Sequence, residues 1–199
     1  MNNGKLIVVE GIDGSGKSTN CAMLSKELQK RNIKNIYTFE PTYGTYGSKL
    51  RESFTTNNLN PYEELDLFVK DRQEHLEKEI KPALANDYIV ILDRYYYSSV
   101  AYQGAKGVDT EYILSLHKDF ILIPDLVFIF HLPVEVALQR IMAKRGFVDR
   151  FEDYEYLKTV DEIFYSFEAP YIHHINANDD INSINNTLLS KILSLNLPL

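Results

Sequence analysis

The sequence is poor in cysteine and in basic residues, and each shortage excludes a class of protein. Cys21 is the only cysteine, so an intrachain disulfide cannot form. The formal net charge of −7 argues against a surface that coats nucleic acid, because such surfaces normally carry a basic excess. We therefore expect no nucleic-acid partner, and a local basic site has to hold any polyphosphate.

Signals for export or membrane insertion are also missing. The first residues, MNNGKLIVV, contain neither a cleavage site nor an apolar stretch long enough to span a bilayer. We expect no membrane association and a cytoplasmic location. No repeat, linker or low-complexity tract interrupts the 199 residues, of which 45% are apolar. This length and composition predict one domain, residues 1–199, with a core of its own.

Apolar runs without polar alternation are the clearest structural signal that the sequence does contain. They predict parallel strands that are covered on both faces, at KLIVVE (5–10), YIVILD (88–93) and DLVFIFHL (125–132). Two weaker runs, at 35–40 and 171–177, are predicted as further strands, and helical patterns occupy 18–31, 134–145 and 181–195. Strands that alternate with helices predict an α/β domain with a parallel sheet.

A glycine-rich loop, GIDGSGKST, joins the first predicted strand to the first predicted helix. Its glycines allow backbone N–H groups to converge on phosphate oxygens, while Lys17 reaches the outer phosphates and Ser18 holds Mg²⁺. The alternative is a plain glycine turn with a helix cap, but the strand before the loop and the helix after it favour nucleotide binding. The predicted ATP-binding residues of the loop are Gly11, Ile12, Asp13, Gly14, Ser15, Gly16, Lys17, Ser18 and Thr19.

A second polar site follows the strand at 88–93. Asp93 and Arg94 lie where a parallel sheet opens its ligand crevice. The carboxylate can serve Mg²⁺ directly or through water, which makes Ser18 and Asp93 the predicted metal residues, and the arginine can grip a phosphate as a fork. The alternative is an ion pair that only caps the strand.

With these two sites in place, the sequence resembles the thymidylate kinase family, and the resemblance spans nearly the whole chain. It is carried by GIDGSGKST, FEPTYGTYGSKLRE (39–52), LFVKDRQEH (67–75), DRYYYSSVAYQ (93–103) and AKRGFVDRFE (143–152). The resemblance implies a P-loop nucleoside monophosphate kinase fold, in which helices flank a central five-stranded parallel sheet. It also implies phosphoryl transfer from ATP to dTMP with Mg²⁺ as cofactor, and a homodimer.

The resemblance also implies how dTMP is bound. Phe68 would stack on thymine and Arg72 would reach its carbonyl edge, since residues four apart share one face of a helix. Arg94 would hold the phosphate of dTMP, with Arg51 as a helper. Without the neighbouring motif, a core position would be the ordinary expectation for Phe68.

Four more residues complete the implied acceptor site. Ser99 and Gln103 would approach the base, and Tyr102 would crowd the ribose 2′ position, which favours deoxyribose. Asp13 would meet the 3′-hydroxyl of the acceptor sugar or the water around the metal. The alternative for Asp13 is a solvated acid in the loop.

A basic segment near 143–151 is predicted to act as a lid. The variable loop positions Ile12–Ser15 carry no basic residue, whereas Lys144, Arg145 and Arg150 follow a predicted helix. The resemblance is to the bacterial type, in which the lid supplies the catalytic arginine, and Arg145 and Arg150 are equal candidates. A basic helix terminus favoured by the helix dipole is the alternative. The predicted catalytic residues are Lys17, Asp93, Arg94, Arg145 and Arg150.

Further features concern the two ends of the site. Arg140 would lie flat against adenine, and NANDD (176–180) would form the loop near the edge of that base. The glycine pair that follows "EP" in many bacterial members is Thr42-Tyr43 here, and Tyr95–Tyr97 are bulky. The sequence therefore defines the class of reaction more closely than it defines the acceptor. The histidines show no metal-ligand spacing and are interpreted as structural or surface residues: His75, His117, His131, His173 and His174.

Two rival functions remain open at this point. A kinase of the same fold could act on dUMP or on a deoxynucleoside, and the set Phe68, Arg72 and Arg94 argues against a nucleoside, which has no phosphate for Arg94. A nucleotide-gated switch would bind or hydrolyse ATP and present a surface to a partner protein. Such a switch would leave the acceptor residues without a purpose.

Overall fold

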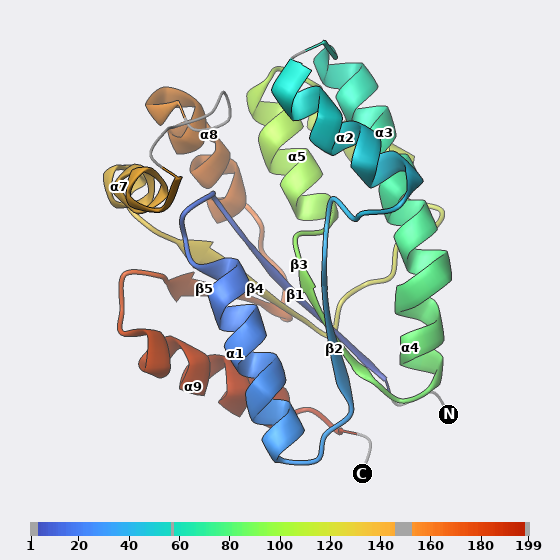
Figure 1. Ribbon diagram of the computed structural model, residues 1–199, viewed down its shortest axis with the longest axis vertical. Coiled ribbons are helices and arrows are strands. Elements are labelled where there is room, and N and C mark those ends of the chain that lie inside the picture. Colours follow the sequence, from blue (N-terminus) through green and yellow to red (C-terminus); the bar gives the residue numbers. More distant parts are fainter. Residues whose placement is uncertain (1–3, 57, 146–152, 198–199) are drawn as a thin grey trace.

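A single twisted parallel sheet organises the chain. The structure is a computed structural model that describes residues 4–56, 58–145 and 153–197. Within that part the sheet has five strands in the order β2-β3-β1-β4-β5, and every neighbouring pair is parallel (Figure 1). The strands are β1 (Lys5–Gly11), β2 (Asn35–Phe39), β3 (Ile89–Asp93), β4 (Leu126–His131) and β5 (Ile172–Asn176). The predicted five-stranded parallel sheet is therefore confirmed.

Helices connect the strands and cover the sheet. Helix α1 packs against β1, β2 and β3 and also contacts α9, while α5 contacts β1, α6 and α8. The helices are α1 (Lys17–Lys30), α2 (Thr45–Thr56), α3 (Pro61–His75), α4 (Lys81–Ala85), α5 (Tyr96–Ala105), α6 (Thr110–His117), α7 (Val134–Arg145), α8 (Tyr154–Tyr165) and α9 (Ile181–Leu193), and a π-helical turn η1 (Leu76–Ile80) joins α3 to α4. The three helical patterns predicted from the sequence correspond to α1, α7 and α9.

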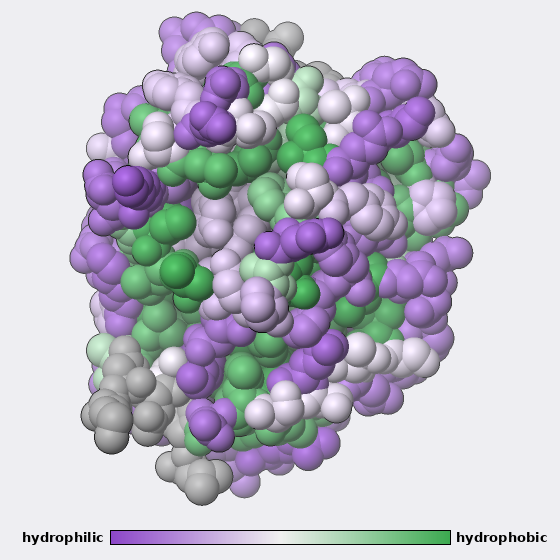
Figure 2. All heavy atoms as spheres, turned by 180° about the vertical axis from the view of Figure 1, so that it is seen from behind, coloured by the Kyte–Doolittle hydropathy of each residue, from purple (hydrophilic) through white to green (hydrophobic). Residues whose placement is uncertain are grey.

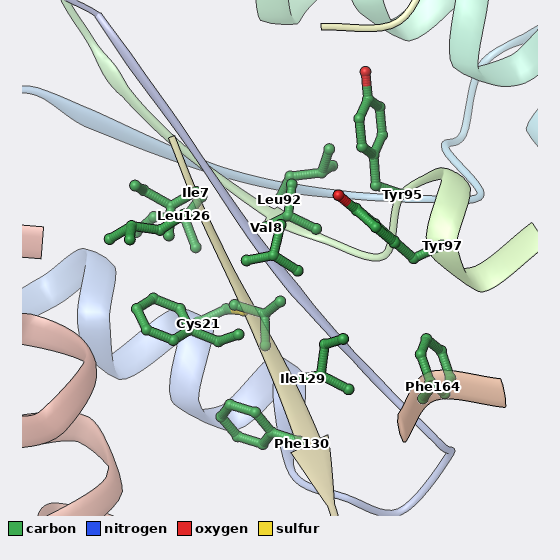
Figure 3. Close-up of a cluster of buried hydrophobic side chains, with 14 of the residues drawn as sticks. Ile7, Val8, Cys21, Leu92, Tyr95, Tyr97, Leu126, Ile129, Phe130 and Phe164 are labelled. Atoms are coloured by element: carbon green, nitrogen blue, oxygen red, sulfur yellow. The ribbon is translucent and has the colours of Figure 1, made fainter. Parts of the chain in front are cut away.

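Burial explains why the central strands lack polar alternation. Every residue of β3 and β4 is buried, as is every residue of β1 after Lys5, because helices cover both faces of the sheet. Figure 3 shows this core, in which side chains from β1, β3 and β4 meet Cys21 of α1 and Phe164 of α8. The edge strands β2 and β5 are only partly buried, which explains their weaker sequence signals.

The strand order places a ligand crevice beside β1. From β1 the chain passes to β2 at one edge, and after β3 it crosses to β4 on the other side of β1. Ligands bind where the order of parallel strands changes direction in this way, at their carboxyl ends. Val9 pairs in register with Asp93, so the glycine loop after β1 and the Asp93-Arg94 pair after β3 lie at the same edge. The two polar sites predicted separately are thus neighbours.

The surface is mixed rather than uniformly polar. From behind, hydrophobic areas alternate with hydrophilic ones (Figure 2). Among the described residues, no helix has both the length and the apolar character needed to cross a membrane. The bulky tyrosines Tyr95, Tyr96 and Tyr97 are buried, with exposed fractions of 0%, 8% and 3%, and none of them lines the ligand pocket. Their bulk is therefore used in packing.

Candidate active site

A pocket of about 780 Å³ lies at the carboxyl ends of the strands and collects most of the predicted site residues. Those that line it are Asp13, Gly14, Ser15, Gly16, Lys17, Ser18, Thr19, Arg51, Phe68, Arg72, Asp93, Arg94, Ser99, Tyr102, Gln103 and Arg140. Ile12 is fully buried, and Gly11 is buried at the end of β1. Arg150 and the side chains of Lys144 and Arg145 lie outside the described residues.

The glycine loop presents backbone N–H groups to this pocket. Gly14 has a φ of +78°, and a Cβ there would lie 2.6 Å from the Ala137 carbonyl oxygen of α7, so only glycine fits. Gly16, with a φ of +92°, precedes the first residue of α1, and no side chain caps the helix. The first N–H groups of α1 and the positive end of its dipole thus face the pocket, which suits an anion.

Lys17, the first residue of α1, is hydrogen-bonded to the backbone of the glycine loop. Its side chain is buried, and its Nζ donates to the carbonyl oxygen of Ile12 at 2.8 Å. Burial, together with the nearby charge of Arg94, lowers the pKa of Lys17 to about 8, although Asp13 and Asp93 oppose the shift. The ammonium therefore gains strongly from an additional anion beside it.

Ser18 and Asp93 form the predicted metal pair. Ser18 Oγ donates to Asp93 Oδ2 at 2.5 Å, and Tyr37 Oη donates to the same oxygen at 3.3 Å. Asp93 Oδ1 is buried and has no donor within the described part of the chain. A hydroxyl beside a carboxylate oxygen that lacks a partner suits Mg²⁺, which prefers oxygen ligands. Among the described residues, no group of three or more His, Cys, Asp or Glu side chains could hold a metal.

Arg94 is fixed between the glycine loop and α5. Its Nη2 lies 2.8 Å from Asp13 Oδ1, its Nη1 donates to Ser98 Oγ at 3.1 Å, and the guanidinium lies over the Tyr102 ring. Its φ of +72° is a conformation that residues other than glycine rarely adopt. Although burial favours the neutral acid, the charges of Arg94 and Lys17 lower the pKa of Asp13 to about 2.

Glu10, which the sequence reasoning missed, holds the turn that carries Arg94. Its carboxylate is fully buried, and it accepts from the backbone N–H groups of Tyr95 at 2.7 Å and Ser98 at 3.2 Å, as well as from Ser98 Oγ at 2.5 Å. Burial raises the pKa of Glu10 to about 7, against the lowering effect of Ser98 and Arg94. Glu10, near the end of β1, thus fixes the backbone that follows Arg94, whose φ is positive.

Arg72 forms the opposite wall of the pocket in a buried ion-pair network. Its side chain is 1% exposed, and its Nε and Nη2 contact Glu40 Oε2 at 2.8 and 2.7 Å. Its Nη1 donates to Ser99 Oγ at 3.1 Å and to His117 Nε2 at 2.6 Å. His75 contacts the other oxygen of Glu40 at 3.2 Å. Although burial favours the neutral ring, Glu40 raises the pKa of His75.

Aromatic side chains and one amide complete this half of the pocket. Phe68 is half-buried beside Phe54, and their ring centroids lie 6.4 Å apart. Gln103 donates to Glu64 at 3.2 Å, while its buried Oε1 has no donor among the described residues. Arg51 lies over the Tyr43 ring, with its guanidinium carbon 4.5 Å from the centroid.

Thr42 and Tyr43, which replace the glycine pair of many bacterial members, are accommodated by contacts with α3 and by exposure to solvent. The backbone N–H of Thr42 donates to Asp71 Oδ2 at 2.8 Å, and its hydroxyl donates to Oδ1 at 2.6 Å. Asp71 belongs to α3, so this segment is tied to the helix that carries Phe68 and Arg72. Tyr43 lines the pocket but is 75% exposed.

The other end of the pocket contains Arg140 and the loop after β5. Both Nη atoms of Arg140 donate to the carbonyl oxygen of Ala177 at 3.4 Å. Ala177 and Asp179, within the predicted loop 176–180, line the pocket with Ile181. A flat guanidinium beside apolar groups suits a nucleobase.

Several residues that line the pocket or contact its walls were not singled out from the sequence. Glu40 ends the run NIYTFE, so its position at the carboxyl edge of the sheet was a usable signal. His117 carries no such signal, because only the packing of α6 brings it to Arg72. The same holds for Tyr37 and Phe54, whose aromatic character does not distinguish a pocket wall from a core.

The charge balance of the pocket favours an anionic ligand. Two of its arginines, Arg72 and Arg94, are paired with carboxylates. Within the described residues, Lys17, Arg51 and Arg140 form no ion pair with a carboxylate, although the chain carries a net charge of −7. A negative chain that gathers cations without carboxylate partners in one pocket is equipped for phosphate groups.

Comparison with known proteins identifies the family. A family model described as thymidylate kinase matches residues 9–188. The thymidylate kinase of Brachyspira hyodysenteriae is 61% identical over 189 residues, which cover 95% of this chain and 93% of that protein. That of Desulfotalea psychrophila is 44% identical over 196 residues, or 98% of this chain and 96% of that protein. The resemblance noted from the sequence is confirmed, and the chain belongs to the thymidylate kinase family of ATP-dependent nucleoside monophosphate kinases.

Proposed function

We propose that this chain, as a single P-loop kinase domain, transfers the γ-phosphoryl group of ATP directly to dTMP, giving ADP and dTDP. The observation that carries the proposal is one pocket that joins a phosphate-binding loop to a second anion site at Arg94. Two separate cationic sites in one cavity suit a reaction between two phosphorylated molecules.

On the donor side, the loop and the start of α1 bind the phosphates of ATP. Lys17 leaves the carbonyl oxygen of Ile12 for the outer phosphates, where the added anion compensates for its burial. Ser18 and Asp93 would hold Mg²⁺, which neutralises charge on the transferred group. Arg140 and the loop 176–180 flank the adenine.

On the acceptor side, Arg94 binds the phosphate of dTMP and Phe68 stacks on the base. Arg72 and Ser99 lie at one edge of the base. The buried Oε1 of Gln103 has no donor among the described residues, and the N–H group of thymine can donate to it. Tyr102 contacts Asp13 and lies near the sugar, where it disfavours a 2′-hydroxyl. Arg51 assists at the phosphate.

The transfer itself needs little covalent chemistry from the protein. The acceptor phosphate is already an anion, so it attacks in line without a protein nucleophile. The low pKa of Asp13 keeps that carboxylate charged, and it holds Arg94 between the two phosphate sites. As part of the same proposal, the lid near 143–151 brings Arg145 or Arg150 to the transferred group. Arg150 and the Arg145 side chain lie outside the described residues.

A homodimer in the cytoplasm is the proposed form of the enzyme. Large apolar side chains are exposed on neighbouring elements, with Tyr62 of α3 56% exposed, Tyr112 of α6 46% and Ile123 72%. The Tyr62 and Tyr112 rings lie 6.2 Å apart, so they form a contiguous apolar surface of the kind that interfaces use. The mass of the particle in analytical ultracentrifugation tests the dimer. The cytoplasm supplies the phosphoryl donor ATP.

The reaction is tested by supplying one acceptor at a time. The purified protein is incubated with ATP, Mg²⁺ and dTMP, dUMP, dCMP, dGMP, AMP or thymidine, and both ADP and the phosphorylated acceptor are measured. We expect ADP to form in step with dTDP and a strong preference for dTMP. ATP loss without any acceptor would instead support the nucleotide switch, and equal use of dUMP would remove the assigned selectivity.

A further inference from the structure

His117 is a fully buried side chain that contacts the base-binding half of the pocket without lining it. It ends α6, and its ring packs near those of Tyr96 and Phe120, with centroids 6.0 and 5.7 Å away. Its two ring nitrogens contact Ile113 O at 2.7 Å and Arg72 Nη1 at 2.6 Å. These contacts assign His117 a role that no sequence motif indicates.

The partners of His117 define its protonation state. An arginine can only donate, so Nε2 must accept from Arg72, and a carbonyl oxygen can only accept, so Nδ1 must carry the proton. Burial and the facing charge of Arg72 lower the pKa of His117 to about 3. His117 is thus a neutral acceptor directed at the arginine.

The donors of Arg72 are almost all occupied. A guanidinium has five N–H groups, and Glu40 takes two of those of Arg72, on Nε and Nη2. Ser99 and His117 take both of those on Nη1. Within the described residues, one N–H group on Nη2 is left for a ligand.

We propose that His117 is a positioning residue that determines specificity for the acceptor base, because it fixes the guanidinium of Arg72 and leaves it one N–H group. This inference rests on the proposed dTMP kinase function. An oxygen acceptor on the base, as in thymine, accepts from that group. An amino group at the same place, as in cytosine, opposes donor to donor, and the fixed guanidinium cannot swing away to relieve the mismatch.

Two substitutions separate this role from simple packing. His117→Gln places an amide oxygen near the position of Nε2, so an acceptor for Arg72 is kept. His117→Asn keeps an N–H donor near the position of Nδ1 for Ile113 O, but it removes the acceptor for Arg72. His131→Asn is the matched control, because His131 is 6% exposed and is hydrogen-bonded through both ring nitrogens to Asp161 and His174, away from the pocket.

The readout is kcat/KM for dTMP against kcat/KM for 5-methyl-dCMP, whose base carries an amino group in place of the oxygen and an unprotonated N3 in place of the N–H group. Both nucleotides meet Gln103 unchanged in every variant, so a change in the ratio reports on Arg72. We expect His117→Asn to lower this ratio at least about tenfold, mainly by raising KM for dTMP, with KM for ATP unchanged. His117→Gln and His131→Asn should keep the ratio close to that of the wild type. A wild-type ratio in His117→Asn would overturn the proposal.

A measurement on the unmodified protein covers the case in which a variant does not fold. In ¹⁵N NMR of histidine-labelled wild-type protein, His117 should show the neutral tautomer with the proton on Nδ1 at neutral pH. A protonated ring, or the proton on Nε2, would refute the acceptor role. If the wild type forms no dTDP at all, the proposed function itself fails, whereas an active wild type with unaffected variants removes only the role of His117.

Discussion

The glycine loop and the Arg72 wall occupy opposite sides of one pocket and recognise their ligands by different means. The loop relies on backbone N–H groups at the start of α1 and on a lysine whose Nζ donates to a carbonyl oxygen and, among the described residues, pairs with no carboxylate. In the wall, the guanidinium of Arg72 is buried and already bonded to Glu40, Ser99 and His117. On the donor side, the charge of Lys17 is therefore compensated only when an anion binds. On the acceptor side, the guanidinium of Arg72 is already fixed before the ligand binds.

This difference predicts how each side responds to substitution. A lysine without a carboxylate partner contributes through its ligand, so its loss should reduce turnover with little effect on stability. A buried ion pair contributes through the fold, because removing one partner leaves an uncompensated charge. Catalytic and structural effects should therefore separate between the two sides.

The largest expected effect is that of Lys17→Met. Because Lys17 is predicted to contact the outer phosphates, we expect kcat to fall about 10³-fold, while the denaturation midpoint changes little. Steady-state kinetics and urea unfolding measure the two quantities. Lys26→Met, on the exposed side of the same helix, is the control. A loss of less than about tenfold at Lys17 would contradict its assigned role.

Glu40→Gln should mainly affect stability. The substitution leaves Arg72 without its carboxylate and removes the charged partner of His75 Nδ1, so we expect the free energy of unfolding to fall by about 3 kcal/mol. Urea denaturation measures this change. Asp66→Asn breaks the exposed pair with Lys70 and should cost less than about 1 kcal/mol. Equal losses in both variants would show that the Arg72 wall is not a special structural element.

Arg94→Ala should affect one substrate only. We expect the dissociation constant for dTMP to rise about 10²-fold because a charged contact with the acceptor phosphate is lost, and that for ATP to stay within a few-fold. Calorimetric titration with each nucleotide measures both constants, and Arg31→Ala, at an exposed site, is the control. Unchanged dTMP affinity would remove Arg94 from the acceptor site.

The smallest expected effect is a pH dependence that originates from His117. Its pKa is lowered to about 3 in the folded protein, below the usual 6.5, so the unfolded chain binds a proton that the folded chain does not. The corresponding stability is present above pH 6.5 and is lost as the pH falls towards 3. Between pH 7 and pH 5, the wild type should lose about 2 kcal/mol more than His117→Gln. Parallel losses in urea unfolding would contradict this pKa.

The same contrast explains how far the sequence could be interpreted. The strands predicted at 5–10, 88–93 and 125–132 and the glycine turn after the first of them are local patterns. The structure has strands at Lys5–Gly11, Ile89–Asp93 and Leu126–His131, and the glycine turn joins β1 to α1, which begins at Lys17. Because ligands bind at the carboxyl ends of parallel strands, the sequence also predicted that Asp93 and Arg94 lie at the ligand crevice, and the structure places them beside the glycine loop. Recognition by backbone groups leaves a strong trace in sequence, because glycine spacing and flanking elements are contiguous.

The remaining site depended on contacts between distant residues. Glu40 and Arg72 are 32 positions apart and Arg72 and His117 are 45 apart, so no local pattern links them. In the sequence, Glu10 is the last residue of an apolar run that predicts a strand, and nothing there indicates that its carboxylate accepts from the backbone N–H group of Tyr95. The family resemblance supplied Arg72 and Ser99 but not Glu40 or His117, since burial and side-chain pairing are set by how α3, α5 and α6 pack.

Calorimetric titration of dTMP tests the central claim most directly, first with the nucleotide-free protein and then with a saturating non-hydrolysable ATP analogue and Mg²⁺ present. Two separate recognition sites in one pocket, of which the acceptor side is preorganised, predict one dTMP bound per chain in both titrations with similar affinity. Displacement of dTMP by the analogue, or no dTMP binding until the analogue is added, would contradict the account.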